Sequence, residues 1–210
     1  MQNAATLYQL LLTAYGRPRW WSGDPFTVMF QAVLVQNTAW ASVEKTWEAI
    51  GDKADPAYIE KLPVEELEAL IRPCGFCKAK ARTVQALAGW FAGYGFDRKK
   101  VQDQPAPKLR TELLAIRGIG AETADVILVY AFYKASFIID AYTRRFLRRF
   151  GYDFADDGAI RRFFETGLPE DAKVYGWLHW LILEHCIGAC RKQPRCEFCP
   201  VREFCGQIIG

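Results

Sequence analysis

The spacing of apolar residues along the chain is that of α-helices. Leu7, Leu10, Leu11 and Ala14 recur three or four residues apart and therefore share one face of a helix. Segment 121–133 is apolar on nearly every face, which predicts a helix at the centre of a core. No stretch alternates between apolar and polar residues as a half-buried strand does, so the pattern predicts an all-α fold. Helices are expected over residues 26–36, 43–50, 64–71, 78–94, 109–116, 121–133, 143–150, 159–166 and 173–185.

The composition limits the class of protein. Hydrophobic residues make up 51% of the 210 residues, which is enough for a packed core in one large domain or two small ones. The net charge of +3 is small, so any preference for a charged partner depends on where the basic residues lie. Residues 1–12 lack the features of an export signal, and the apolar run 126–139 is interrupted by Lys134 and too short to span a membrane. We therefore expect a cytoplasmic protein with reduced cysteines and no membrane partner.

Cysteines close to the C-terminus give the sharpest chemical signal. Cys190, Cys196, Cys199 and Cys205 have the spacing C-x5-C-x2-C-x5-C, and the residues between them are mostly polar or charged. Thiolates gathered in this way hold zinc or an iron–sulfur cluster. Zinc sites usually contain two close cysteine pairs, whereas this chain has one close pair between two single cysteines, with Pro200 directly after Cys199. The pattern favours a [4Fe–4S] cluster; zinc, a pair of disulfides or buried thiols are the alternatives.

A second motif precedes the cysteines. Residues 113–124 (LLAIRGIGAETA) are predicted to form two helices joined by a tight turn. Gly118 and Gly120 have no side chains, so backbone N–H groups at the start of the second helix can approach a phosphate. Such a turn also joins helices in proteins that bind nothing. Asp140 follows the apolar run 137–139 and is either a helix N-cap or a functional carboxylate.

The order of the hairpin, the aspartate and the cysteines resembles that in the helix-hairpin-helix DNA glycosylases of the endonuclease III type. The resemblance extends over roughly residues 20–205. It implies two helical subdomains with a cleft between them: a six-helix barrel with the hairpin (25–133), and a [4Fe–4S] cluster subdomain formed by both termini (1–24 and 134–210). The first cysteine gap has five residues where the bacterial endonuclease III pattern has six, so participation of Cys186 stays open.

The resemblance also implies the chemistry. Enzymes of this kind act on double-stranded DNA, flip a damaged nucleotide out of the duplex and cut its glycosidic bond. The family's aspartate, at the position of Asp140, stabilises the cationic sugar of the transition state. Bifunctional members carry a lysine where this chain has Glu122, and a glutamate cannot form a Schiff base. We therefore expect a monofunctional enzyme. We also expect it to be a monomer that works on DNA of the nucleoid.

The aromatic residues bear on the choice of base. Trp20, Trp21 and the segment 35–40 (VQNTAW), which ends in Trp40, look like the corresponding parts of the 3-methyladenine DNA glycosylases. In that group aromatic side chains sandwich the flipped base, and a cationic alkylated purine gains cation–π stabilisation between indoles. Simple packing in the core is the alternative for these tryptophans.

Other residues are expected to touch the DNA. By resemblance, Gln36 fills the space left by the flipped nucleotide, and Phe76 is an apolar wedge opposite the lesion, with packing under a loop as the alternative. Contacts with phosphates are expected from Gly118, Gly120, Arg191, Lys192 and Arg195. The predicted function is removal of alkylated purines such as 3-methyladenine. The alternatives are an endonuclease III-like enzyme for oxidised pyrimidines, a mismatch glycosylase, or a binder of damaged DNA without catalytic activity.

Overall fold

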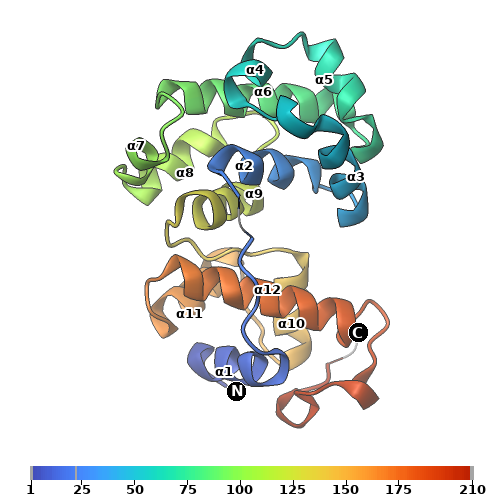
Figure 1. The fold of residues 1–210 in the computed structure, drawn as a ribbon. Coiled ribbons are helices and arrows are strands. Elements are labelled where there is room, and N and C mark those ends of the chain that lie inside the picture. Colours follow the sequence, from blue (N-terminus) through green and yellow to red (C-terminus); the bar gives the residue numbers. More distant parts are fainter. Residues whose placement is uncertain (1, 22, 209–210) are drawn as a thin grey trace. The chain divides into compact units, whose positions relative to one another are not determined.

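The fold is helical throughout the part of the chain that the structure, a computed structural model, describes: residues 2–21 and 23–208 (Figure 1). No strand occurs within these ranges, so the predicted all-α class is confirmed. The α-helices are α1 (Ala4–Tyr15), α2 (Pro25–Leu34), α3 (Trp40–Ile50), α4 (Pro56–Lys61), α5 (Val64–Leu70), α6 (Cys77–Gly93), α7 (Arg98–Gln102), α8 (Ala106–Leu114), α9 (Ala121–Val126), α10 (Ala141–Phe150), α11 (Asp157–Gly167) and α12 (Ala172–Gly188). Shorter helical turns are η1 (Gly51–Lys53), η2 (Arg72–Cys74), η3 (Ile127–Ala131), η4 (Cys196–Phe198) and η5 (Arg202–Phe204).

The helices form two compact units. One unit contains Met1–Trp20 and Ala135–Gly210, and therefore both ends of the chain, and the other contains Trp21–Lys134. We call them the terminal unit and the central unit. None of the described helices is both long enough and apolar enough to cross a membrane.

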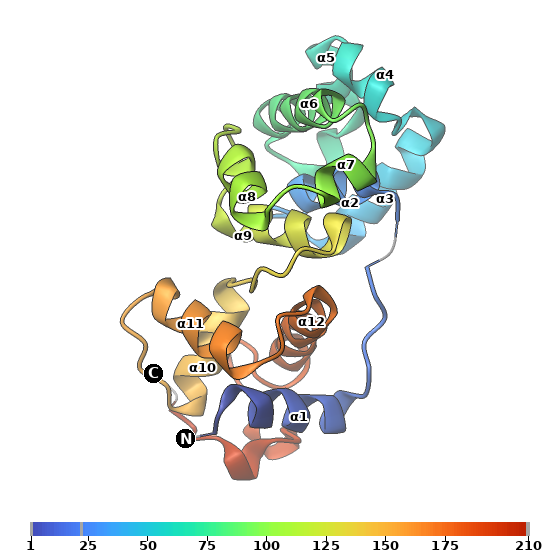
Figure 2. The ribbon, with the colours of Figure 1, turned by 90° about the vertical axis from the view of Figure 1, so that its left-hand side faces the viewer.

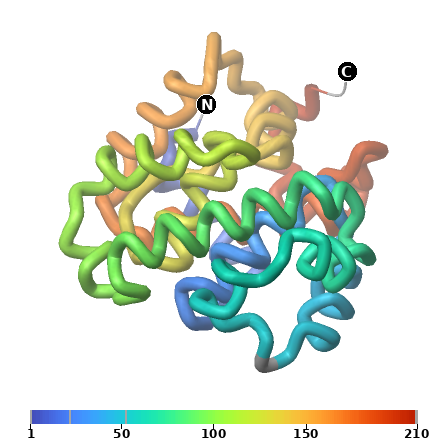
Figure 3. The backbone as a smooth tube through the Cα atoms, turned by 90° about the horizontal axis from the view of Figure 1, so that it is seen from above, coloured from blue at the N-terminus to red at the C-terminus, as the bar shows by residue number. Residues whose placement is uncertain are grey.

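In the central unit, α2 is the buried helix that the sequence predicts. Asp24 caps it with a side-chain oxygen that accepts the N–H groups of Phe26 and Thr27, and Pro25 occupies its first turn. Its apolar side chains, Phe26 to Leu34, are almost all buried, and it packs against α6 and η3 (Figure 3). The helix α6 also packs against α4 and α5, so it supports the loops that precede and follow these elements.

In the terminal unit, α12 is the helix around which the others pack. The N-terminal helix α1 lies against α11 and α12, and α10 lies against α12 (Figure 2). Aspartates at positions 140, 156 and 171 cap α10, α11 and α12, each accepting backbone N–H groups of the first turn. Leu7 and Leu11 of α1 and Phe146 of α10 belong to the resulting core.

Candidate functional site

Asp140 is the N-cap of α10 in the terminal unit. Its Oδ1 accepts the backbone N–H of Thr143 at 2.6 Å, and its Oδ2 lies 3.7 Å from Nε2 of His179 on α12. Burial raises the pKa of this carboxyl, but the contacts with His179 and the Thr143 backbone outweigh burial and hold the pKa below its ordinary value. The structure thus confirms the N-cap and shows a fixed, buried negative charge, which is the property that stabilisation of a cationic sugar requires.

The neighbour of Asp140, His179, is a residue that the sequence did not single out. The side chain is mostly buried, 12% exposed, because α12 packs against α10. The two residues are far apart in the sequence, so no local pattern links them, and only the helix packing brings the imidazole to the carboxylate.

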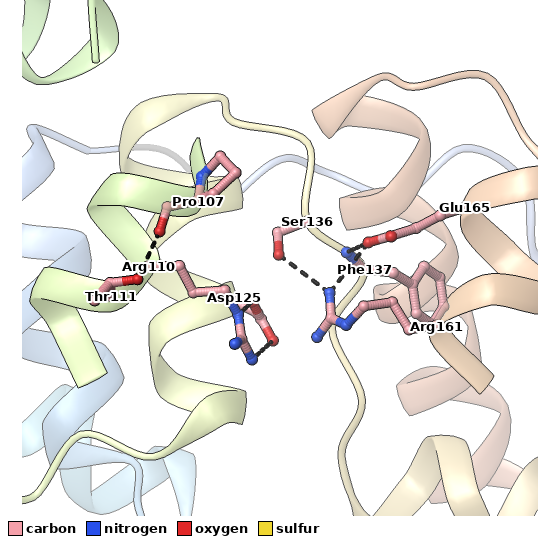
Figure 4. Close-up of polar contacts among 8 residues, drawn as sticks. All are labelled: Pro107, Arg110, Thr111, Asp125, Ser136, Phe137, Arg161 and Glu165. Carbon is pink, nitrogen blue, oxygen red and sulfur yellow. Dashed lines mark hydrogen bonds and ion pairs between the residues drawn. The ribbon is translucent and has the colours of Figure 1, made fainter. Parts of the chain in front are cut away.

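The backbone that leads to Asp140 is also anchored within the terminal unit. Glu165 accepts the N–H of Phe137 at 3.0 Å, and Arg161 donates to both Glu165 and the hydroxyl of Ser136 (Figure 4). These contacts fix the extended segment between Ser136 and the N-cap. The position of the carboxylate therefore depends on α11 as well as α10 and α12.

The C-terminal cysteines come together around one pocket. Cys190, Cys196, Cys199 and Cys205 line it, and each of them is partly buried. The other lining residues are Phe146, Arg149, Phe150, His185, Ala189, Pro194 and Gln207. The pocket is thus walled by four thiols and by apolar rings from α10, which is the kind of sheltered, sulfur-rich site that an iron–sulfur cluster needs.

The pocket offers four cysteine sulfurs as donors. Thiolates of this kind are ligands of zinc and of iron–sulfur clusters. The backbone N–H of Gln207 already donates to the sulfur of Cys205 at 3.3 Å, a contact that suits a thiolate.

Cys186 lies outside this set. It is buried on α12 one turn before Cys190, its thiol faces the carbonyl of Tyr142 at 3.6 Å, and it does not line the pocket. A hydrogen bond with Cys190, together with burial, raises the pKa of Cys186. The same hydrogen bond lowers the pKa of Cys190 to about 4, with contributions from His185 and Arg149. The geometry therefore separates one buried thiol from four that line the pocket.

The loop after Cys190 is held by the buried guanidinium of Arg149. This group donates to the carbonyls of Cys190, Arg191 and Lys192. The side chains of Arg191, Lys192 and Arg195 are exposed, while the backbone that carries them is fixed from inside. The three basic side chains are therefore exposed to solvent, while the loop carbonyls that Arg149 binds have hydrogen-bond partners.

In the central unit, α8 and α9 form the predicted hairpin. Arg110 of α8 donates two hydrogen bonds to the carboxylate of Asp125 on α9, at 2.8 and 3.3 Å (Figure 4). Gly118 has a φ of +97°, and a Cβ there would lie 2.1 Å from Oγ1 of Thr83. Gly120 has an ordinary φ of −91°, and a Cβ there would meet nothing within 4 Å. The first glycine is thus required by the turn itself, and the second leaves open space at the start of α9.

Gln36 lies in a turn that contacts this hairpin, and Phe76 lies directly before α6. Nε2 of Gln36 donates to the carbonyl of Gly118 at 3.1 Å and to Oγ1 of Thr123 at 2.8 Å. Phe76 is 72% exposed, so it is not packed under a loop, and its φ is +47°. The structure thus brings Gln36 to the hairpin and leaves the Phe76 ring in solvent.

Two of the three expected pocket tryptophans are in contact. Trp21 and Trp40 pack edge to face with ring centroids 5.3 Å apart, and Trp21 also lies 5.5 Å from the ring of Tyr130. Trp21 is anchored by a hydrogen bond to Gln31, whereas Trp40 is 42% exposed. Trp20 belongs to the terminal unit and is half-buried. Tyr130, which the sequence did not mark, joins the aromatic group from the π-helical turn η3.

Comparison with known proteins agrees with these features. Residues 30–170 match the HhH-GPD superfamily of base excision DNA repair proteins. A Methanocaldococcus jannaschii protein provisionally named a DNA repair glycosylase is 38% identical over 206 residues, which are 95% of this chain and 94% of that protein. The structure of a 3-methyladenine DNA glycosylase of H. pylori bound to 1,N6-ethenoadenine is similar, with a TM-score of 0.72 and 26% identity over 87% of this chain and 96% of that one.

An endonuclease III trapped as a covalent intermediate with DNA has the same fold, with a TM-score of 0.79 and 23% identity over 99% of this chain and 97% of that one. The matched segment contains the hairpin and the capping aspartate, and the helical architecture agrees over nearly the whole chain. The chain belongs to the HhH-GPD superfamily of base excision DNA repair proteins and is a helix-hairpin-helix DNA glycosylase.

Proposed function

We propose that the chain is a monofunctional glycosylase that removes N-alkylated purines such as 3-methyladenine from double-stranded DNA. The exposed indole of Trp40, held edge-on by Trp21, carries this proposal. A base with a positive charge gains about 0.5–2 kcal/mol against the face of an electron-rich ring, whereas a neutral pyrimidine does not. The similarity to a 3-methyladenine DNA glycosylase bound to 1,N6-ethenoadenine supports the same substrate class.

Asp140 is the catalytic residue of the proposed reaction. An alkylated purine is already a good leaving group because it carries a positive charge, so the reaction needs little acid assistance. The main requirement is a fixed anion for the sugar as the glycosidic bond breaks and water is added. The low pKa of Asp140 keeps its carboxylate ionised at neutral pH, and the product is an abasic site.

Glu122 is the reason for proposing no strand cleavage. It is exposed in the first turn of α9, at the position where the bifunctional relatives are expected to carry their lysine. A carboxylate cannot attack the sugar to form a Schiff base, and a negative charge in this turn suits the helix dipole. Borohydride trapping with substrate DNA is expected to give no covalent adduct; an adduct would show that another amine acts as a lyase.

The four pocket cysteines are proposed to hold a [4Fe–4S] cluster. Its role is structural: it closes the segment from Cys190 to Cys205 and fixes the loop from which Arg191, Lys192 and Arg195 reach phosphates. Protein purified without oxygen is expected to be brown and to contain about four iron and four sulfide per chain if the site is of this type. One zinc and no visible absorption would assign the site to zinc instead.

A panel of lesions tests the substrate class. Duplexes that contain 3-methyladenine, 7-methylguanine, thymine glycol, uracil or a mismatched thymine are incubated with the enzyme, and the free base is measured. Release of the methylated purines, lost in Asp140→Asn, is the expected result. Release of only oxidised or mismatched pyrimidines would refute the aromatic-pocket argument. Tight binding without release of any base would identify a damage-binding protein.

A further inference from the structure

Lys80 is a lysine buried in the central unit. It lies on α6, is 3% exposed, and its Nζ contacts three oxygens: the carbonyls of Leu34 and Cys74, each at 2.8 Å, and Oγ1 of Thr38 at 2.7 Å. An ammonium has three donors, and all three are used here. The acceptors are uncharged, so only these three hydrogen bonds offset the desolvation free energy of the buried ammonium. The offset depends on the positions of the three oxygens.

The carbonyls that Lys80 binds belong to the ends of two helical segments. Leu34 is the last residue of α2, and Cys74 is the last residue of η2. Carbonyls at a helix end lack an intrahelical partner and carry partial negative charge. One ammonium therefore replaces the missing partners of two chain segments that are distant in the sequence, and it draws them together.

Each of these segments leads directly into a turn with unusual backbone. Asn37, between Gln36 and Thr38, has a φ of +52°, and Phe76, two residues after Cys74, has a φ of +47°. Residues other than glycine adopt this left-handed conformation at a cost and keep it only where the surroundings enforce it. Thr38 adds a direct link, because its hydroxyl lies 2.6 Å from the carbonyl of Cys74.

The same helix also holds the hairpin. Thr83 lies three residues after Lys80, on the same face of α6, and its hydroxyl donates to the carbonyl of Arg117 at 3.0 Å. Gln36 donates to the neighbouring carbonyl of Gly118. The turn of Gln36, the turn of Phe76 and the hairpin are thus joined by side-chain contacts that converge on one face of one helix.

We propose that Lys80 is a positioning residue. It fixes the position of the Gln36 turn relative to the Phe76 turn, so that the two side chains meet the DNA in a preformed arrangement. This proposal rests on the proposed function, because the roles of Gln36 and Phe76 in the DNA belong to it. Lys80 itself touches no substrate. Preformed geometry matters here because a misplacement of about 1 Å can reduce a rate about 100-fold.

The test compares Lys80→Met with Lys78→Met, which changes an exposed lysine two residues earlier on the same helix. A duplex with 2-aminopurine beside a tetrahydrofuran abasic-site analogue reports unstacking of the DNA by fluorescence, and it needs no base release. Lys80→Met is expected to bind undamaged duplex within about twofold of the parent and to unstack the DNA at least about tenfold more slowly. Lys78→Met is expected to behave as the parent does.

Thr38→Val provides a second variant that removes one acceptor of Lys80 and the link to Cys74 with little change in shape. It is expected to slow unstacking less than Lys80→Met does, and the double variant Lys80→Met/Thr38→Val to be slowed by less than the product of the two single effects, because the contacts share one acceptor and support the same two turns. The unfolding midpoint of each variant is measured in parallel, and all assays are run below the lowest midpoint.

The outcomes separate the two proposals. Normal unstacking by folded Lys80→Met refutes the positioning role. If Lys80→Met does not fold and Thr38→Val unstacks DNA as the parent does, Lys80 serves stability alone and the proposal is also refuted. If the parent releases no alkylated base but Lys80→Met still loses the fluorescence response, the substrate proposal fails while the positioning role stands.

Discussion

Gly118→Ala tests the physical basis of the hairpin. The new methyl group would lie 2.1 Å from Oγ1 of Thr83, at a backbone φ of +97°. The left-handed conformation costs alanine about 1–2 kcal/mol. The single proton of the Thr83 hydroxyl is shared between the carbonyls of Arg117 and Ala79; the hydroxyl has to rotate away and loses its hydrogen bond to Arg117, which adds roughly 1–2 kcal/mol. Gly118→Ala is therefore expected to lower the free energy of unfolding by about 2–4 kcal/mol.

Gly120→Ala is the matched control. A methyl group there meets nothing within 4 Å, and the φ of −91° suits alanine. The only stability cost is the poorer N-cap, under about 1 kcal/mol. Because the methyl group occupies the space that a phosphate would approach, Gly120→Ala is expected to weaken binding of undamaged duplex several-fold in a fluorescence anisotropy titration.

The assay for stability is urea unfolding followed by circular dichroism, with Thr83→Ala and Gly118→Ala/Thr83→Ala included. The double variant is expected to lose less stability than the sum of the single losses, because the alanine at position 83 removes the clash. Equal destabilisation by the two glycine variants, or strict additivity in the double variant, would refute the steric argument.

Further predictions concern the terminal unit. Asp140→Asn keeps an N-cap and is expected to retain duplex binding while base release falls about 100- to 1000-fold; unchanged release would exclude Asp140 from the chemistry. His179→Phe removes a contact that lowers the pKa of Asp140, so the acid limb of the pH–rate profile for base release is expected to move to higher pH; an unmoved limb would contradict this. Cys199→Ser is expected to lower iron content and duplex affinity together, as measured by metal analysis and anisotropy, whereas full iron occupancy would remove Cys199 from the ligands.

The helical pattern predicted the elements well where their limits are set locally. The start of α2 is set locally, by the Asp24 cap and by Pro25 in the first turn. The end of this helix was predicted at residue 36, but α2 ends at Leu34, because the next residues form the turn that Lys80 and Thr38 hold. Segment 121–133 was predicted as one helix, whereas its second half is a π-helical turn. The turn after α2 is held by contacts from distant residues, which the local pattern does not show.

Some residues of the candidate site could be identified from the sequence, and others could not. The glycine hairpin, the capping aspartate and the four cysteines could be identified because their spacing along the chain is itself the signal. Lys80, Thr83 and His179 could not, because each acts on a residue that only the packing of helices brings near. A lone lysine in a helical segment is normally a solvated residue, and nothing in its neighbours distinguishes Lys80 from Lys78.

Three buried charged side chains in the described part of the chain bind backbone groups. Lys80 binds two carbonyls, Arg149 binds the carbonyls of three successive loop residues, and Asp140 accepts a backbone N–H. Apolar packing fixes helices against each other, but it cannot satisfy the carbonyls of a loop or fix their direction. A charged side chain does both, since its hydrogen bonds are stronger than neutral ones, at about 1.5–3 kcal/mol each. Replacing Lys80 or Arg149 by an apolar residue of similar size therefore leaves several buried carbonyls unpaired at once, and we expect the loss to fall on the loops proposed to face the DNA rather than on the helical core.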